Sequence, residues 1–580
     1  MRSLALTAAA LSALSPALAA SEDCRCFPGD ACWPAEETWS SFNKTVGGKL
    51  IKTVPIGSVC HDPQYDEEAC EALKAVWLDP DTHIETSHSV QSALFANASC
   101  DPLAPREAPC VVGTYVQYAV SVSNANDISK TLKFANEKNI RLVIRNTAHD
   151  YLGKSTGAGA LGIWTKNMKD MKKVKWSDKF YKGDAIKMGA GVSAADVGRF
   201  AHEQGLVIVS GNCPSVGPAG GFIQGGGHGP LGSKFGMGAD QALEFEVVDG
   251  SGKLVVANRR KNSDLFWALR GGGPGTFGVV VSATVKAYPD LPVSFGTLMF
   301  ASAGLAEDRF YGACKAFYEI VPSLVDAGCV PIFLFTPEAF VLQELIAPGL
   351  TEAELDKLLE PFLAKLEGIQ YQKNIVPYKS YLDFQSEALA PMLKHQANFI
   401  QGGSWLIPRS LVTESESFEK YFAAVKEIVN SGAFVQQLGF NVAEKEGGDI
   451  DNAVLPSWRD TLIHAVVAVP WNPAGSIEEN HAALLSVHDD KISKLAALAP
   501  ESGSYMNEAI PFNANWKKDF YGANYEKLES IKDKYDPHHT FHAFTGVGGD
   551  YWVEQADKRL CKAGTEYVKE EEKKDEKDEL

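Results

Sequence analysis

The sequence predicts an α+β protein with at least two large domains. Its 580 residues are enough for two to four domains, each with a sizeable core. Up to about residue 289, a strand–helix–strand pattern is followed by valine-rich strands with many glycines between them. From about 290 to 500, long helical patterns alternate with short apolar strands. That alternation is typical of a second α+β domain.

The first domain begins with the strand–helix–strand unit. The segment CVVGTYVQYAVSVSN (110–124) is rich in valine and tyrosine and is predicted to be extended. The segment DISKTLKFANEKNI (127–140) has helical spacing, with Asp127 as the predicted N-cap. RLVIRN (141–146) then predicts the second strand.

Valine and glycine dominate the remainder of the first domain. FEVVDGSGKLVVAN (245–258) predicts a hairpin, and FGVVVSATVKAYP (277–289) predicts a further strand. Glycine is frequent between Gly153 and Gly278, which indicates several close backbone contacts in this stretch.

Helical and apolar patterns alternate in the second domain. Helices are predicted within 306–325 and 414–432, and a strand within 464–472. From residue 501 the chain is rich in aromatic residues and loop-like, with one predicted helix near 525–535.

Both ends of the chain carry targeting patterns. Residues 1–19 combine Arg2, an apolar stretch and a small-residue cleavage pattern, which indicates a signal peptide; a membrane anchor is the alternative, but the stretch is short and rich in alanine. No later stretch is apolar enough to cross a membrane, so we expect no stable membrane insertion. The charged tail 551–580 ends in the retrieval signal Lys577, Asp578, Glu579 and Leu580, which predicts an endoplasmic reticulum lumen location and a retrieval receptor as partner. The alternatives are a merely solvated tail and full secretion.

Charge and cysteine usage narrow the class of protein further. The net charge of −18 argues against nucleic acid or an anionic membrane as partner. Seven of the eleven cysteines lie within the first 110 residues, which predicts a disulfide-rich segment in an oxidising compartment. Cys314 and Cys329 form a candidate local pair. Cys213 has no neighbouring cysteine, and leaving it out allows up to five disulfides. Glycosylation sequons begin at Asn43 and Asn97.

Three glycine-rich clusters lie within about 130 residues: 145–156, 210–230 and 264–281. Glycines let backbone N–H groups approach a bulky anion, so the clusters predict a cradle for a cofactor pyrophosphate; simple turns are the alternative. GAGALG (157–162) fits a dinucleotide fingerprint, but a polar turn precedes it and no helical pattern follows. A Rossmann fold is therefore not expected.

The three clusters together resemble the covalent-flavin oxidases of the vanillyl-alcohol oxidase/p-cresol methylhydroxylase superfamily. The similarity runs from Ala108 to Gly549 and is strongest to the berberine-bridge-enzyme-like branch, in its fungal secretory-pathway type. It implies a two-subdomain FAD-binding domain and an α+β substrate domain whose antiparallel sheet is covered by helices. The expected division is: signal peptide 1–19, cysteine-rich segment 20–107, FAD-binding domain 108–289, substrate domain 290–500, berberine-bridge-like segment 501–550 returning to the FAD domain, and charged tail 551–580.

The resemblance also implies two covalent links to the flavin. In the family, the histidine of R-x-x-x-H-x-Y-x-G-x-S is bonded to the flavin 8α carbon, and His149 matches it. Thr147-Ala148 replaces two glycines that usually precede this histidine. The motif G-x-C-P-x-V-G-x-x-G-G-x-x-x-G-G-G is matched in full from Gly211 to Gly227, and its cysteine, here Cys213, attacks flavin C6. A buried free cysteine and an ordinary packed histidine are the structural alternatives.

The same motifs assign further contacts to FAD. Besides His149 and Cys213, the expected cofactor-binding residues are Arg145, Asn146, Thr147, Ala148, Asp150, Gly153, Ser155, Pro214, Val216, Gly217, Gly220, Gly221, Gly225, Gly226, Gly227, Val280 and Asn507.

The catalytic base is expected in the C-terminal segment. Related enzymes place a tyrosine fourth in Y-x-N-Y, whereas YMNE here keeps Tyr505 and Asn507 and puts Glu508 at that position. Glu508 can accept a hydroxyl proton if burial raises its pKa towards the working pH. A solvated surface glutamate is the alternative. Tyr505 is expected to orient flavin or substrate.

Three other features receive weaker assignments. Val216 is small where a larger side chain in relatives hinders oxygen, which favours an oxidase over a dehydrogenase. His228 either lines the site or packs, with packing preferred. HHTFH (538–542) places His538 and His542 four residues apart, but the preceding Asp-Pro marks a turn, so no metal is expected.

The expected function is oxidation of an alcohol or activated C–H of a small molecule, with O₂ reduced to H₂O₂. A secondary-metabolite intermediate is the favoured substrate. The alternatives are an oxidative cyclase, a carbohydrate oxidase and a non-catalytic flavoprotein.

Overall fold

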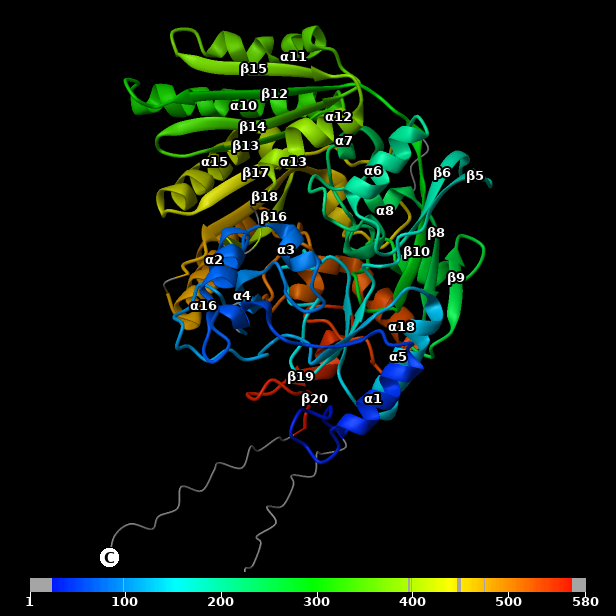
Figure 1. Ribbon diagram of the computed structural model, residues 1–580. Coiled ribbons are helices and arrows are strands. Elements are labelled where there is room, and N and C mark those ends of the chain that lie inside the picture. The colour runs from blue at the N-terminus through cyan, green and yellow to red at the C-terminus, as the bar shows by residue number, and fades with distance from the viewer. Residues whose placement is uncertain are drawn as a thin grey trace, which may run out of the picture.

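The computed structural model describes residues 23–96, 99–394, 397, 399–445, 450–473 and 475–565. The largest sheet, with its helices, occupies the upper left of the molecule, and two smaller sheet-containing parts lie to its right and below it (Figure 1). Within the described residues, no helix is both long and apolar enough to cross a bilayer. The predicted signal peptide, the sequon at Asn97 and the terminal retrieval signal lie outside the described residues.

The first sheet has four strands in the order β1-β2-β4-β3. β2, β4 and β3 are parallel, and β1 from the cysteine-rich segment joins them antiparallel at β2. Helix α5 connects β2 to β3 and packs Ile128 and Leu132 into the core, which confirms the strand–helix–strand unit. The elements are α1 (Glu36–Thr45), β1 (Leu50–Lys52), α2 (Glu67–Ala75), α3 (Pro80–Ile84), α4 (Ala93–Ala96), β2 (Tyr118–Ser121), α5 (Ala125–Glu137), β3 (Leu142–Arg145) and β4 (Leu161–Trp164).

The predicted N-cap of α5 is wrong. Asn124 caps the helix, because its side chain accepts a hydrogen bond from the backbone N–H of Asp127. The Asp127 carboxylate is instead held by the Lys49 ammonium at 2.6 Å and by the N–H and hydroxyl of Ser123. Lys49 is 78 positions away, so local sequence gave no sign of this competition.

The second sheet is antiparallel, with five strands in the order β5-β6-β10-β8-β9. β8 and β9 form the predicted hairpin, and β10 is the predicted valine-rich strand. The GAGALG segment (157–162) leads directly into strand β4 and opens no helix. This agrees with the expectation that the domain is not a Rossmann fold. The elements are β5 (Met171–Ser177), β6 (Lys182–Gly189), α6 (Ala194–Glu203), β7 (Leu206–Val207), α7 (Gly232–Phe235), α8 (Gly238–Gln241), β8 (Ala242–Val248), β9 (Leu254–Asn258), α9 (Ser263–Ala268), β10 (Val279–Lys286) and β11 (Tyr288–Pro289).

The third sheet has seven antiparallel strands in the order β15-β12-β14-β13-β17-β18-β16. Helices α10 and α15 lie along it (Figure 1). Its elements are β12 (Val293–Ala301), α10 (Glu307–Asp326), β13 (Val330–Phe335), β14 (Ala339–Pro348), α11 (Glu352–Lys365), β15 (Tyr371–Tyr378), α12 (Tyr381–Phe384), α13 (Ala390–Met392), β16 (Ile400–Pro408), α14 (Arg409–Thr413), α15 (Ser415–Asn430), β17 (Phe434–Gly439), β18 (Thr461–Pro470), α16 (Ile477–Ser486) and α17 (Ser493–Leu498).

The two faces of this sheet have different partners. On β18, Ile463, Ala465 and Val467 pack into the core formed with the helices. Val466 and Ala468 point the other way and line a cavity. Because side chains alternate along a strand, the odd positions of β18 from Ile463 onward stabilise the fold and the even positions after it are available for a site, while Leu462 also packs into the core.

The C-terminal segment returns to the first two sheets, as the resemblance implies. Helix α18 (Tyr525–Tyr535) carries Lys532, whose ammonium is fully buried and contacts the Asp536 carboxylate at 2.6 Å. The same ammonium donates to the carbonyls of Thr276, in the third glycine-rich cluster, and Phe541. Strands β19 (Trp552–Glu554) and β20 (Leu560–Lys562) end the described chain. A buried ammonium with three oxygen partners fixes this segment against the glycine-rich cluster.

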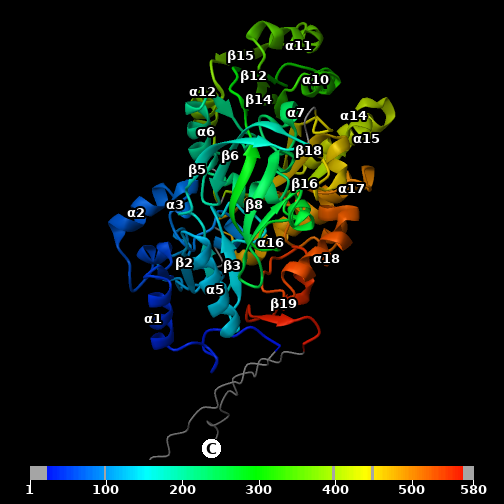
Figure 2. The same ribbon diagram turned by 90° about the vertical axis from the view of Figure 1, so that its right-hand side faces the viewer.

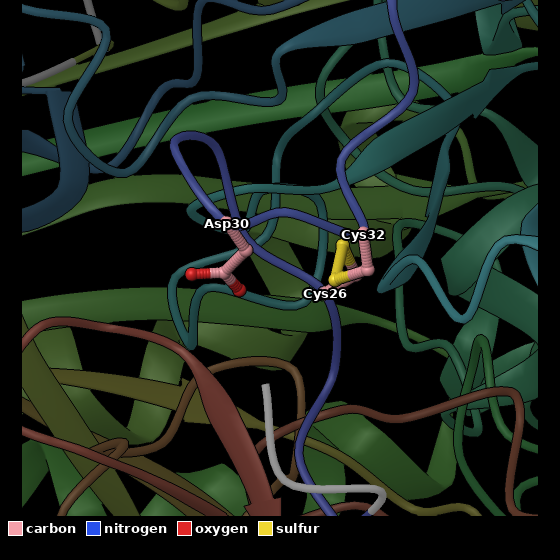
Figure 3. Close-up of side chains that lie close together, drawn as sticks. All are labelled: Cys26, Asp30 and Cys32. Carbon is pink, nitrogen blue, oxygen red and sulfur yellow. A yellow bond between two sulfur atoms is a disulfide. The ribbon is translucent and has the colours of Figure 1, made fainter. Parts of the chain in front are cut away.

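Four disulfides form, not the five that ten cysteines would allow: Cys24–Cys561, Cys26–Cys32, Cys60–Cys70 and Cys100–Cys110. The first joins the two ends of the described chain, which lie together at the bottom of the molecule (Figure 2). Figure 3 shows Asp30 beside the Cys26–Cys32 bond; its carboxylate accepts from the Arg559 guanidinium, so this group is a disulfide loop and not a metal site.

The predicted Cys314–Cys329 pair is wrong, since both thiols are free and buried. Cys314 lies within α10, whose axis rises about 18 Å between Cys314 and the helix end at Asp326. Three residues after the helix cannot bring Cys329 back to within disulfide distance of Cys314.

Candidate active site

A cavity of about 520 Å³ lies between the glycine-rich clusters and the seven-stranded sheet. Its volume falls in the range of sites that hold small molecules and cofactors. Fifteen of the predicted site residues line it: Asn146, Thr147, Ala148, His149, Asp150, Ser155, Cys213, Val216, Gly217, Gly220, Gly221, Val280, Tyr505, Asn507 and Glu508. The structure therefore brings residues from all three glycine-rich clusters and from the C-terminal segment to one cavity.

The other predicted cofactor residues are not among those that line the cavity: Arg145, Gly153, Pro214, Gly225, Gly226 and Gly227. The buried Arg145 guanidinium donates to the carbonyls of His83 and Thr86, and burial lowers its pKa to about 9. At Gly225 an added Cβ would lie 2.3 Å from Asn507 Nδ2, so glycine is required there for the close approach of Asn507. Direct contact of these residues with a cofactor stays a prediction.

His149, Cys213 and Ser215 form a hydrogen-bonded cluster at the cavity wall. His149 Nε2 lies 2.8 Å from Ser215 Oγ and 3.9 Å from Cys213 Sγ, and Ser215 Oγ lies 3.3 Å from the sulfur. Burial by itself would raise the pKa of the Cys213 thiol, but the charge and hydrogen bond of His149 and the hydrogen bonds of Ser215 lower it to about 7. Cys213 is thus a partly exposed thiol with a lowered pKa, which is the setting of a reactive cysteine.

Glu508 accepts hydrogen bonds from two histidines of separate elements. Its Oε1 lies 2.9 Å from His228 Nε2, and its Oε2 lies 2.7 Å from His464 Nε2. The condition set for a base, a pKa of Glu508 raised by burial towards the working pH, is not met. Burial acts in that direction, but the charges and hydrogen bonds of His228 and His464 outweigh it and lower the pKa well below its ordinary value. The carboxylate is therefore ionised and lies inside the cavity wall, with its side chain 28% exposed.

Two of these partners were not assigned to the site from sequence. His228 lines the cavity, so the preference for simple packing is wrong. His464 is fully buried on β18, and burial lowers its pKa. The sequence signal available for His464 was its position in the alternation of the strand. It lies two and four residues before Val466 and Ala468, on the same cavity-facing side of β18.

Tyr505 and Asn507 support this wall of the cavity. Asn507 Nδ2 donates to the Tyr505 hydroxyl at 2.9 Å and to the Gly221 carbonyl at 3.1 Å. The Tyr505 ring packs against Trp458, His228 and His464, and its burial raises the pKa of the phenol. Tyr505 is therefore a protonated residue that positions Asn507 and the two histidines.

A polar patch lines the part of the cavity nearest the seven-stranded sheet. Gln436 Nε2 donates to Gln343 Oε1 at 2.8 Å, and Asn212 Nδ2 lies 3.4 Å from Glu344 Oε2. Burial raises the pKa of Glu344 to about 7. Near neutral pH about half of the Glu344 carboxyls carry a proton and can donate a hydrogen bond into the cavity.

His538 and His542 are not brought together with this site. His538 is exposed, whereas His542 is half-buried beside the Phe544 ring, and its burial lowers its pKa well below the ordinary value. Of the described residues, the ligand-type group at the cavity is His228, His464 and Glu508, whose atoms lie within 4.8 Å of one another. Direct hydrogen bonds already join them, and the absence of a metal stays a prediction.

Comparison with known proteins decides the family. A family model described as FAD binding domain matches residues 116–258, and one described as Berberine and berberine like matches residues 504–548. The FAD-linked oxidoreductase patO of Penicillium expansum is 42% identical over 555 residues, covering 95% of this chain and 97% of the relative. The chain belongs to the VAO-type FAD-linked oxidoreductases.

Other members of the family agree in both fold and length. The crystal structure of the VAO-type flavoprotein MtVAO615 from Myceliophthora thermophila C1 has a TM-score of 0.90 and 39% identity, covering 93% of this chain and all of that one. The bifunctional decalin synthase calF of Penicillium decumbens is 37% identical over 95% of this chain and 98% of its own. The predicted fold class, a two-subdomain FAD-binding domain with an antiparallel substrate sheet covered by helices, is confirmed.

The cavity of this VAO-type oxidoreductase fits FAD. At Gly275 an added Cβ would meet nothing within 4 Å, so the lining is open there, and at Gly221 it would only touch Pro274 at 3.8 Å. Asn146 Oδ1, in this lining, is buried without a hydrogen-bond partner in the described part of the chain. An open, glycine-lined wall with a polar atom in need of a partner suits a large polar cofactor.

Substituting Glu344 with glutamine tests its raised pKa. Native Glu344 holds its proton up to about pH 7, while the unfolded carboxyl loses it near 4.5, so the native state loses stability as the pH rises through this window. Glu344→Gln cannot ionise. Its free energy of unfolding should therefore exceed that of the wild type by up to about 3 kcal/mol at pH 8, with no such gain at pH 4. Thermal unfolding at both pH values measures the difference. The exposed Glu338→Gln, on the same β13–β14 hairpin, should show none; an equal effect in both variants would contradict the assignment.

Proposed function

We propose that the protein is a FAD-dependent oxidase whose flavin is bound through both His149 and Cys213. The observation that carries the proposal is that the two nucleophilic side chains lie 3.9 Å apart in the wall of the same cavity that exposes the Glu508 carboxylate. Two nucleophiles at this separation can react with two carbons of the same aromatic ring system. The proposed substrate is an alcohol or an activated C–H of a small molecule, with a secondary-metabolite intermediate favoured and O₂ reduced to H₂O₂.

Glu508 is the proposed base for the substrate proton. It accepts the hydroxyl proton at a carboxylate oxygen while His228 and His464 hold both oxygens in place. The lowered pKa of the Glu508 carboxyl makes it a weak base by itself. The substrate proton is therefore taken up by the hydrogen-bonded unit of Glu508, His228 and His464, whose three side chains titrate together.

The substrate's remaining polar groups have partners on the sheet side of the cavity. Glu344 in its protonated form can donate to a carbonyl, and the Gln343–Gln436 pair offers amide donors and acceptors. Val216 leaves room beside Cys213 at the cavity wall, which supports access for O₂. Bound FAD supplies the acceptor for the hydride and passes the two electrons to oxygen.

An oxidative cyclase is the second candidate. It is favoured by the relative named bifunctional decalin synthase, since the same cavity and base would serve formation of a ring. One equivalent of H₂O₂ accompanied by a product with a new ring identifies this activity; a new carbonyl identifies the alcohol oxidase.

Acid precipitation of the purified chain tests the two links. Flavin should remain with the pellet, and peptide mapping should find its mass on the peptides of His149 and Cys213. His149→Ala and Cys213→Ala should each keep one link, and the double variant should release all its flavin into the supernatant. Release of all flavin from the wild type would refute covalent binding while leaving the family assignment intact.

Glu508→Gln tests the base. The variant should retain flavin, but the rate of flavin reduction by substrate should fall by about 10²–10⁴-fold, because proton transfer to a positioned base is lost. Stopped-flow absorbance measures that rate. Glu501→Gln, an exposed carboxyl in the same segment, is the matched control and should reduce at the wild-type rate. A wild-type rate in Glu508→Gln would assign the base to another group.

We further propose that the enzyme resides in the endoplasmic reticulum lumen, through the predicted signal peptide and the retrieval signal at residues 577–580. The four disulfides support an oxidising compartment. Deletion of the last four residues should move the protein into the culture medium, as judged by immunoblotting. Equal retention with and without them would favour another address.

A further inference from the structure

Ser215 lies between the two nucleophiles of the site and contacts both. Its hydroxyl oxygen is 2.8 Å from His149 Nε2 and 3.3 Å from Cys213 Sγ. His149 and Cys213 line the cavity, whereas Ser215 is outside the lining described for it. The hydroxyl therefore contacts both reacting side chains although Ser215 is not one of the residues that line the cavity.

The backbone holds Ser215 in this place independently of its side chain. The turn is closed by a hydrogen bond from the Val216 N–H to the Cys213 carbonyl. Its carbonyls at Pro214 and Val216 accept from the N–H groups of Ala195 and Ala194 at the start of α6. These bonds do not involve the hydroxyl, so removal of the hydroxyl should leave the turn intact.

A hydroxyl has one proton to donate and lone pairs with which to accept. When Ser215 accepts the Nε2–H of His149, its own proton is free to point at the sulfur. That arrangement leaves a lone pair of the imidazole on Nδ1 and stabilises the thiolate of Cys213. Nδ1 of His149 and the sulfur of Cys213 then each offer the lone pair that a nucleophile needs.

We propose that Ser215 is the proton-relay residue for attachment of the cofactor, serving His149 and Cys213 with a single hydroxyl. This inference rests on the proposed bicovalent function. Attachment at His149 breaks one C–H bond of the cofactor and one imidazole N–H bond and forms one C–N bond; attachment at Cys213 likewise replaces C–H and S–H by C–S. In each case two electrons and two protons pass to O₂, which leaves as H₂O₂. Ser215 takes the imidazole proton from Nε2 while the C–N bond forms at Nδ1, and it takes the thiol proton from the sulfur.

Three substitutions test the relay. Ser215→Ala removes the hydroxyl, while Ser215→Val and Ser215→Thr form a pair of equal shape that differs in the hydroxyl alone. The full-length chain is produced under riboflavin limitation and mixed with FAD in air. The fraction of flavin resistant to acid precipitation is followed over time, and peptide mapping locates it.

Ser215→Ala and Ser215→Val should bind FAD but attach it at least about tenfold more slowly at both residues, and Ser215→Thr should attach it at nearly the wild-type rate. Attachment at the wild-type rate in the Ala and Val variants would overturn the inference, as would slowing at one residue alone. If Ser215→Ala is not recovered as folded protein, the Thr and Val pair decides. A wild-type chain that never links to FAD would refute the proposed function itself, which is a different result from any Ser215 effect.

Discussion

The candidate site depends on one ionised carboxylate held between two imidazoles. Glu508 comes from the C-terminal segment, His228 from the second glycine-rich cluster and His464 from the seven-stranded sheet, and the first two are 280 positions apart. A charge removed from water needs charge-assisted hydrogen bonds to be tolerated. The three parts of the chain must therefore meet in one arrangement, and the cavity wall takes its shape from that requirement.

Two hydrogen-bonded clusters divide the chemistry of the cavity. At one part of the wall, His149, Ser215 and Cys213 bring two nucleophiles and a hydroxyl together. At another, the Glu508 unit offers a negative charge supported by Tyr505 and the residues around it. In both clusters a hydrogen-bonded neighbour overrides the effect of burial on the pKa of the central group.

The cysteines likewise fall into two groups, those that stabilise the fold and the one that lies at the site. Disulfides staple the N-terminal segment and join it to the C-terminal strands through Cys24–Cys561. Cys314 and Cys329 stay reduced in the apolar core, where burial raises the pKa of each thiol well above its ordinary value. Cys213 alone among the free thiols is partly exposed, and its lowered pKa sets it apart from the inert pair.

The sequence by itself determined the elements and motifs whose cause is local. The unit around α5, the β8–β9 hairpin, helix α18 and the Gly211–Gly227 motif were all readable, because periodicity and glycine placement act over a few residues. Only the tertiary structure decided which residue caps α5, that Cys314 forms no disulfide, that His228 and His464 belong to the site, and that the pKa of Glu508 is lowered. Each of these depends on a partner far away in sequence or on the geometry of a whole helix. Composition and local spacing do not specify such long-range contacts.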